Sequence, residues 1–178
     1  MIPEKTISEE QLYTGKVLDF AVRQVELPNG SQAKREIAIN KGGVTVVALT
    51  DKNEVRLVKQ YRAAAQKWVI ELPAGTLERG EDPDRGIRRE LLEETGDQAA
   101  HWQKLIGYYS APAILTEYIH IYLATGLTPG PNHLEADEFL EVLTVPLPEA
   151  LDMVYRGEID DAKTIIGLLL AARQLGAG

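Results

Sequence analysis

Apolar residues recur along the chain in short runs, and turn residues separate these runs. Near the N-terminus they alternate with polar residues over 16–26, with the period of two that is typical of a half-buried strand. Asn29-Gly30 follows and favours the tight turn of a hairpin, so a second strand is expected over 32–39. The pattern therefore predicts a small β-hairpin domain over residues 1–41.

From residue 42 onwards, strand patterns and helix patterns are mixed without regular alternation. Apolar runs rich in β-branched residues predict strands over 44–49, 55–61, 67–72, 102–109, 118–124 and 138–145. Helices are expected from Pro83 to the residue before Gly96, from Pro148 to Arg156, and over about 161–175. This order indicates an α+β domain over 42–178 and not a doubly wound fold.

The helix that begins at Pro83 carries a crowd of glutamates. Asp82 is a good N-cap, and proline suits the first helical position because its missing N–H would be unpaired there. Glu90, Glu93 and Glu94 point to roughly one side, since residues three and four apart share a helix face. Like charges at this spacing destabilise a helix by about 0.2–0.5 kcal/mol per pair. A hard cation such as Mg²⁺ would remove the conflict, because it binds carboxylate oxygens.

A solvated surface is the more common explanation of an acidic helix face. Solvation requires neither the glycines at 75 and 96 nor the arginine at 89, and no lysine is interleaved with the glutamates on this face. A metal site is therefore the favoured interpretation.

The segment GTLERGEDPDRGIRRELLEETG, from Gly75 to Gly96, resembles the Nudix box. The box pattern is Gly, five residues, Glu, seven residues, Arg-Glu-aliphatic, one residue, Glu-Glu, one residue, Gly, and then an aliphatic residue. The residues in register are Gly75, Glu81, Arg89, Glu90, Leu91, Glu93, Glu94 and Gly96. Only Asp97 departs from the pattern. The resemblance implies hydrolysis of a pyrophosphate bond with Mg²⁺, for which Mn²⁺ can substitute, and a mixed β-sheet sandwiched between helices.

The resemblance also implies which residues bind the metal. The family's ligands fall on the backbone carbonyl of Ala74 and on the carboxylates of Glu90, Glu93 and Glu94. These three glutamates are therefore also the expected catalytic residues, because the metal carries the chemistry.

Two further residues are expected to assist catalysis. Arg89 could pair with Glu81 or Glu93 and hold the carboxylates in place, with Glu81 as a support and not a ligand. Glu117, five residues after Pro112, matches a glutamate on a mobile loop that acts as the base or helps to bind metal in related enzymes. An ordinary glutamate at a strand edge is the alternative for Glu117.

Residues outside the box resemble those of ADP-ribose pyrophosphatases. The segment Glu71-Leu72-Pro73-Ala74 leads into the box as it does in that subfamily, Pro112 stands at the position of its marker proline, and the segments 138–142 and 157–164 are similar to its C-terminal signatures. The implied reaction is hydrolysis of ADP-ribose to AMP and ribose 5-phosphate. The alternatives are another nucleotide sugar, such as GDP-mannose, and a non-catalytic ADP-ribose-binding Nudix sensor, although sensors tend to lose box glutamates and this chain keeps them.

Four residues are expected to bind the substrate. Arg62 suits a phosphate or the terminal ribose, since a guanidinium fork matches phosphate oxygens, and Glu71 precedes the box in the same subfamily segment. Arg35 and Glu36 match positions that reach across a dimer to the adenine in relatives, with an exposed charge pair as the alternative. The resemblance thus implies a homodimer formed through the N-terminal domain.

Composition narrows the class of protein further. The chain has 178 residues, with 19 basic and 27 acidic side chains and a net charge of −8, which argues against general binding to nucleic acid or to an anionic membrane. It has no cysteine, which excludes disulfides and thiolate sites. No apolar run is long enough to span a bilayer. We expect a cytoplasmic protein.

Overall fold

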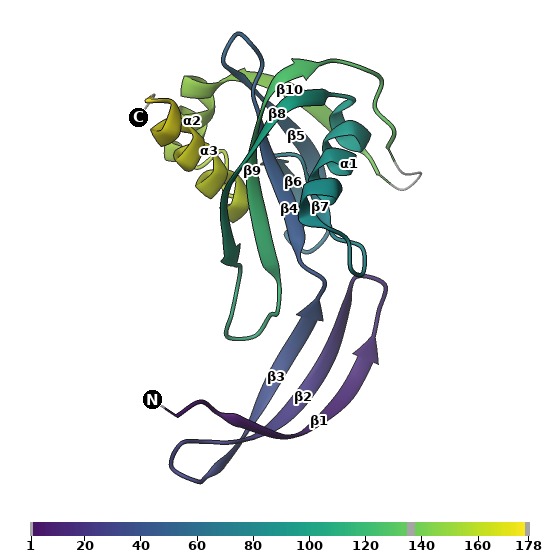
Figure 1. Cartoon of the computed structure of the whole chain (residues 1–178), viewed down its shortest axis with the longest axis vertical. Coiled ribbons are helices and arrows are strands. Elements are labelled where there is room, and N and C mark those ends of the chain that lie inside the picture. The colour runs from purple at the N-terminus through teal and green to yellow at the C-terminus, as the bar shows by residue number, and fades with distance from the viewer. Residues whose placement is uncertain (1, 135–137, 177–178) are drawn as a thin grey trace. The chain divides into compact units, whose positions relative to one another are not determined.

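The computed structural model describes residues 2–134 and 138–176, and the chain forms two compact units (Figure 1). Unit 1 contains the residues up to Gly42 together with Tyr108–Tyr118, and unit 2 contains Gly43–Gly107 and the residues from Ile119 onwards.

Unit 1 is a three-stranded antiparallel sheet in the order β1-β2-β3. Strands β2 (Leu18–Glu26) and β3 (Gln32–Asn40) form the predicted hairpin, and Gly30 in its turn has a φ of 82°. Strand β1 (Lys5–Thr14) was not predicted, because all of its residues are exposed and it has no buried face to impose a period of two.

The segment Tyr108–Tyr118 joins unit 1 by backbone pairing with β3. The Ala38 N–H donates to the Ile114 carbonyl at 2.8 Å, and the Thr116 N–H donates to the Ala38 carbonyl at 3.0 Å. A part of the chain that is distant in sequence therefore completes this unit.

The described residues of unit 2 form two sheets and three helices. One sheet has the order β10-β5-β6 and is antiparallel, and the other, β7-β4-β9-β8, is mixed because β4 pairs parallel with β9 and antiparallel with β7. The strands are β4 (Gly43–Ala48), β5 (Glu54–Arg62), β6 (Lys67–Glu71), β7 (Ala74–Thr76), β8 (Gln98–Tyr109), β9 (Tyr118–Thr128) and β10 (Leu140–Pro146). The helices are α1 (Pro83–Thr95), α2 (Leu147–Tyr155) and α3 (Ala162–Leu175).

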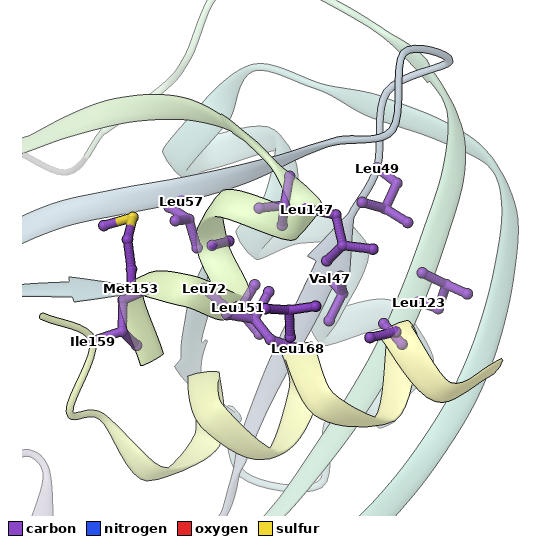
Figure 2. Close-up of a cluster of buried hydrophobic side chains, with 14 residues drawn as sticks. Val47, Leu49, Leu57, Leu72, Leu123, Leu147, Leu151, Met153, Ile159 and Leu168 are labelled. Atoms are coloured by element: carbon purple, nitrogen blue, oxygen red, sulfur yellow. The ribbon is translucent and has the colours of Figure 1, made fainter. Parts of the chain in front are cut away.

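The helices of unit 2 lie on both sides of its sheets (Figure 1). A cluster that includes Ile87 and Leu91 packs α1 against β4 and β9. A second cluster, shown in Figure 2, packs α2 and α3 on the other side, with Leu72, Leu147 and Leu168 fully buried. This arrangement confirms the predicted α+β fold with a mixed sheet between helices.

The ends of α1 are as the sequence predicts. The Asp82 side chain accepts a hydrogen bond from the Asp84 N–H, and Gly96 ends the helix with a φ of 76°. Because these caps depend on local sequence alone, they can be read without knowledge of the fold. Among the described residues, no helix is long and apolar enough to cross a membrane.

Candidate active site

The backbone around Ala74 meets two carboxylates of α1. The Ala74 N–H donates to Glu94 Oε2 at 3.0 Å. A Cβ on Gly75 would lie 2.0 Å from the Glu90 carboxylate, so only glycine allows this close approach. The structure thus brings the backbone of Ala74 and Gly75 together with Glu90 and Glu94, while the role of the Ala74 carbonyl as a metal ligand stays a prediction.

Burial sets the charge of these two carboxylates. Glu90 is 7% exposed and Glu94 is 3% exposed. Burial raises the pKa of Glu90 to about 7, against the opposing charge of Arg89. It raises the pKa of Glu94 to about 8, although the bond from the Ala74 N–H lowers it. Burial thus favours the protonated form of both carboxyl groups, more strongly for Glu94 than for Glu90, unless a cation compensates their charge.

Arg89 links the glutamates to one another. Its Nη1 donates to Glu90 Oε1 at 2.8 Å and to Glu93 Oε2 at 2.9 Å. Its Nε and Nη2 donate to the two oxygens of Glu81 at 3.1 and 3.0 Å. The sequence predicts a bond to either Glu81 or Glu93, and Arg89 makes both. Since both Glu81 oxygens are used, this side chain is suited to support Arg89 and not to bind metal.

The donor set fits a hard divalent cation. In the described ranges, no three His, Cys, Asp or Glu side chains form a ready-made metal site. Glu93 and one oxygen of Glu90 bind Arg89 instead. The crowded, buried carboxylates of Glu90 and Glu94 are nevertheless oxygen ligands of the kind that Mg²⁺ prefers. A cation there would offset the cost of burying their charges.

Glu138, to which the sequence pattern assigns no role, has a charge that acts on the same site. It raises the pKa of both Glu90 and Glu94. Its sequence signal was the segment 138–142, which resembles a subfamily signature without indicating a role. Residues 135–137, which precede it, lie outside the described residues.

Arg62, the last residue of β5, forms a forked ion pair with Glu71, the last residue of the antiparallel strand β6. Arg62 Nε donates to Glu71 Oε1 at 2.9 Å, and Nη2 donates to Oε2 at 2.5 Å. The Arg62 side chain is 42% exposed, while Glu71 is buried. Although burial opposes it, the hydrogen bonds from Arg62 and the charge of Lys163 hold the pKa of Glu71 below its usual value. Arg62 is thus the partner that can reach a ligand, and a direct substrate contact by Glu71 stays a prediction.

Three of the predicted site residues belong to unit 1, namely Arg35, Glu36 and Glu117. The carboxylates of α1 belong to unit 2. Arg35 Nε donates to Glu4 at 3.1 Å, and Glu36 faces Val22 in the β2-β3 register. Glu117 lies in the segment that pairs with β3. Their roles stay predictions.

A buried ion pair accounts for the departure of Asp97 from the box pattern. It is buried, and its Oδ2 accepts a hydrogen bond from Arg56 Nε at 2.7 Å. This ion pair connects Asp97, just beyond the end of α1, to β5. The box pattern has an aliphatic residue at the position of Asp97.

More than nine tenths of the chain is similar to known proteins. It is 44% identical over 165 residues to an ADP-ribose pyrophosphatase of Bacillus subtilis, covering 92% of this chain and 89% of that protein. It is 42% identical over 170 residues to a methanol dehydrogenase activator of Bacillus methanolicus, covering 94% and 92%. It is 39% identical over 170 residues to an ADP-ribose pyrophosphatase of Mycobacterium tuberculosis, covering 93% and 81%.

A solved structure and a family model agree with this similarity. The crystal structure of an ADP compounds hydrolase matches with a TM-score of 0.88 at 20% identity and covers 100% of this chain and 98% of that chain, which shows a shared fold. The NUDIX domain model matches residues 40–166. That range contains the box, the Ala74 backbone and the buried carboxylates, and the chain therefore belongs to the Nudix family.

Proposed function

We propose that this protein is a Mg²⁺-dependent pyrophosphatase that hydrolyses ADP-ribose to AMP and ribose 5-phosphate. The observation that carries the proposal is the pair of buried carboxylates, Glu90 and Glu94, packed against the backbone of Ala74 and Gly75. A folded protein gains nothing from crowding these charges unless a cation uses them. Two of the relatives named above are ADP-ribose pyrophosphatases, which supports the choice of substrate.

The proposed ligands are the Ala74 carbonyl and the carboxylates of Glu90, Glu93 and Glu94. When bound, a divalent cation supplies charge neutralisation for the diphosphate and makes water more acidic. Mn²⁺ has similar ligand preferences and can substitute. Arg89 bridges the carboxylates of Glu90 and Glu93, which helical spacing already puts on one side of α1.

The chain's own residues supply the rest of the site. We assign Arg62 to a phosphate or the terminal ribose, because its guanidinium is exposed and preoriented by Glu71. Between Glu117 and Glu138, we favour Glu138 as the proton acceptor, because its charge acts on the two buried carboxylates. Its carboxylate could take the proton of the attacking water.

A homodimer and a cytoplasmic location belong to the same proposal. Unit 1 exposes large apolar side chains on and after β1, including Ile7, Leu12 and Tyr13. An exposed apolar surface of this kind is typical of a protein interface. A second copy that covers it would also bring Arg35 and Glu36 near a neighbouring substrate, as in the relatives that these positions resemble.

The experiment is a substrate panel with Mg²⁺, read by chromatography, with a Glu94→Gln variant as the inactive control. We expect AMP and ribose 5-phosphate from ADP-ribose, and no comparable turnover of GDP-mannose. A strong preference for GDP-mannose would contradict the substrate. Tight binding of ADP-ribose by calorimetry, without release of AMP, would identify a sensor instead.

A further inference from the structure

The N-terminal turn of α3 is bonded to the segment that leads into the box. The Leu72 N–H donates to Thr164 Oγ1 at 2.8 Å, and this hydroxyl donates to Asp161 Oδ2 at 2.6 Å. Both Leu72 and Thr164 are fully buried. The turn is therefore fixed, through Leu72, to the backbone that continues to Ala74.

Lys163 makes a second connection from the same turn. Its Nζ lies 3.1 Å from Glu71 Oε2 and 3.0 Å from Asp161 Oδ2. The Lys163 side chain is only 15% exposed, so these bonds form largely out of contact with water. Ion pairs in such surroundings are screened less than exposed ones.

Glu71 lies between two cations, since Arg62 binds both of its oxygens and Lys163 binds one. The Gln60 side-chain amide also donates to Oε2, at the longer distance of 3.4 Å. The terminal torsion of a glutamate is soft, so the carboxylate plane turns easily unless several partners hold it. With Lys163 in place, the plane of Glu71 is fixed, and the Arg62 fork is fixed with it. Without Lys163, the long and uncharged bond from Gln60 restrains the carboxylate less, so Arg62 can follow Glu71 into other orientations.

Lys163 also affects how strongly Arg62 attracts an anion. A carboxylate that binds one guanidinium largely cancels the positive charge of that guanidinium. When the carboxylate is shared with an ammonium group, the guanidinium keeps more of its attraction for other anions. The Arg62 Nη1 lies outside the fork with Glu71 and is the nitrogen that can meet a substrate oxygen.

We propose that Lys163 is a positioning residue that acts through Glu71 to hold Arg62 ready for the anionic substrate. The inference rests on the proposed function for its kinetic test, but the bonds that carry it lie within unit 2 and do not depend on the identity of the substrate. It assigns α3, which carries no box residue, a part in substrate binding.

The kinetic test compares Lys163→Met with wild type on ADP-ribose and Mg²⁺. We expect KM to rise about tenfold while kcat changes less than about threefold, because binding and not chemistry is affected. Lys163→Arg should restore most of the loss, since it returns a cation to Glu71. The matched control is Lys67→Met, because Lys67 pairs with Asp160 just before the same turn and both side chains are half-exposed; it should leave KM unchanged.

A double-mutant cycle tests the route through Arg62. In an Arg62→Gln background, Lys163→Met should raise KM little further, because residues that act through one another do not have additive effects. If the rise in KM of the double variant equals the product of the rises in the two single variants, the proposal is wrong. If Lys163→Met does not fold, Lys163→Gln keeps a hydrogen-bond donor without the charge and answers the same question.

A readout without turnover separates this inference from the proposed function. The Arg62 Nε–Hε signal in a ¹⁵N NMR spectrum, identified by its loss in Arg62→Lys, should exchange faster with water in Lys163→Met and return to its original rate in Lys163→Arg. If wild type releases no AMP, the proposed function fails, and this signal still decides the role of Lys163. If wild type is active but neither KM nor the signal changes in Lys163→Met, the inference is wrong and the function stands.

Discussion

The substitution Glu94→Gln tests two effects of the Glu94 charge. One is its contribution to turnover, and the other is its effect on the free energy of unfolding. Glu94 is buried beside Ala74, whose N–H it binds at 3.0 Å. Glutamine has nearly the same size and its amide oxygen can still accept this bond, but it carries no charge. If the carboxylate contributes about 4 kcal/mol to the transition state, the rate should fall by about 10³.

The same substitution should alter how stability depends on pH. Burial raises the pKa of Glu94 to about 8 from its ordinary value of 4.5. Between these two pH values the folded protein keeps a proton that the unfolded chain has lost, so rising pH favours unfolding. The stabilising contribution is complete below about pH 4.5 and is lost as the pH rises through about 8, at about 1.4 kcal/mol per pH unit.

From pH 5 to pH 8, the ionisation of Glu94 should lower the free energy of unfolding of the metal-free wild type by about 3 to 4 kcal/mol. Glu94→Gln has no such group, so its free energy of unfolding should depend less steeply on pH. Glu90, with its pKa raised to about 7, also lowers the free energy of unfolding as the pH rises, and it does so in both wild type and Glu94→Gln. At pH 8 without metal, we therefore expect the inactive variant to be the more stable one.

The assay is urea unfolding in a chelator between pH 5 and pH 8, alongside turnover in Mg²⁺. Glu149→Gln, an exposed site on α2, is the matched control and should follow the wild-type curve. A folded Glu94→Gln with near-normal turnover would refute the catalytic assignment. Equal pH slopes for wild type and Glu94→Gln would refute the argument from burial.

Three further changes test other parts of the site. Gly75→Ala puts a Cβ where the Glu90 carboxylate lies, so turnover should fall roughly 10²-fold; steady-state kinetics on the folded variant would reveal an error if the rate were unchanged. Asp97→Asn leaves Arg56 without its charged partner, and the free energy of unfolding by urea should drop by about 3 kcal/mol; a drop below 1 kcal/mol would mean that the pair is not buried as argued. Arg89→Lys loses the planar fork that binds several carboxylate oxygens, so kcat should fall about tenfold, and wild-type kcat would count against a positioning role.

Several features of this protein are determined by the sequence alone. The caps at Asp82 and Gly96 define α1, and the helical spacing of Glu90, Glu93 and Glu94 puts them on one side. These features depend on residues within one or two helical turns, so local rules suffice. The hairpin of β2 and β3 is of the same kind, because Asn29-Gly30 specifies its turn.

Other features depend on which strands and helices pack together. Strand β1 has no buried face and so no hydrophobic period to reveal it. Local spacing cannot predict that Arg56 would bind Asp97, or that Lys163 would bind Glu71, because these partners lie 41 and 92 residues apart.

The spacing of the glutamates follows from the sequence, but their protonation does not. Only the packing of α1 against the Ala74 backbone removes Glu90 and Glu94 from water and raises their pKa values. The charge of Glu138 reaches the same site only after folding. Local sequence therefore decides which residues can share a helix face, whereas tertiary structure decides their solvation and their charged neighbours, on which the proposed chemistry depends.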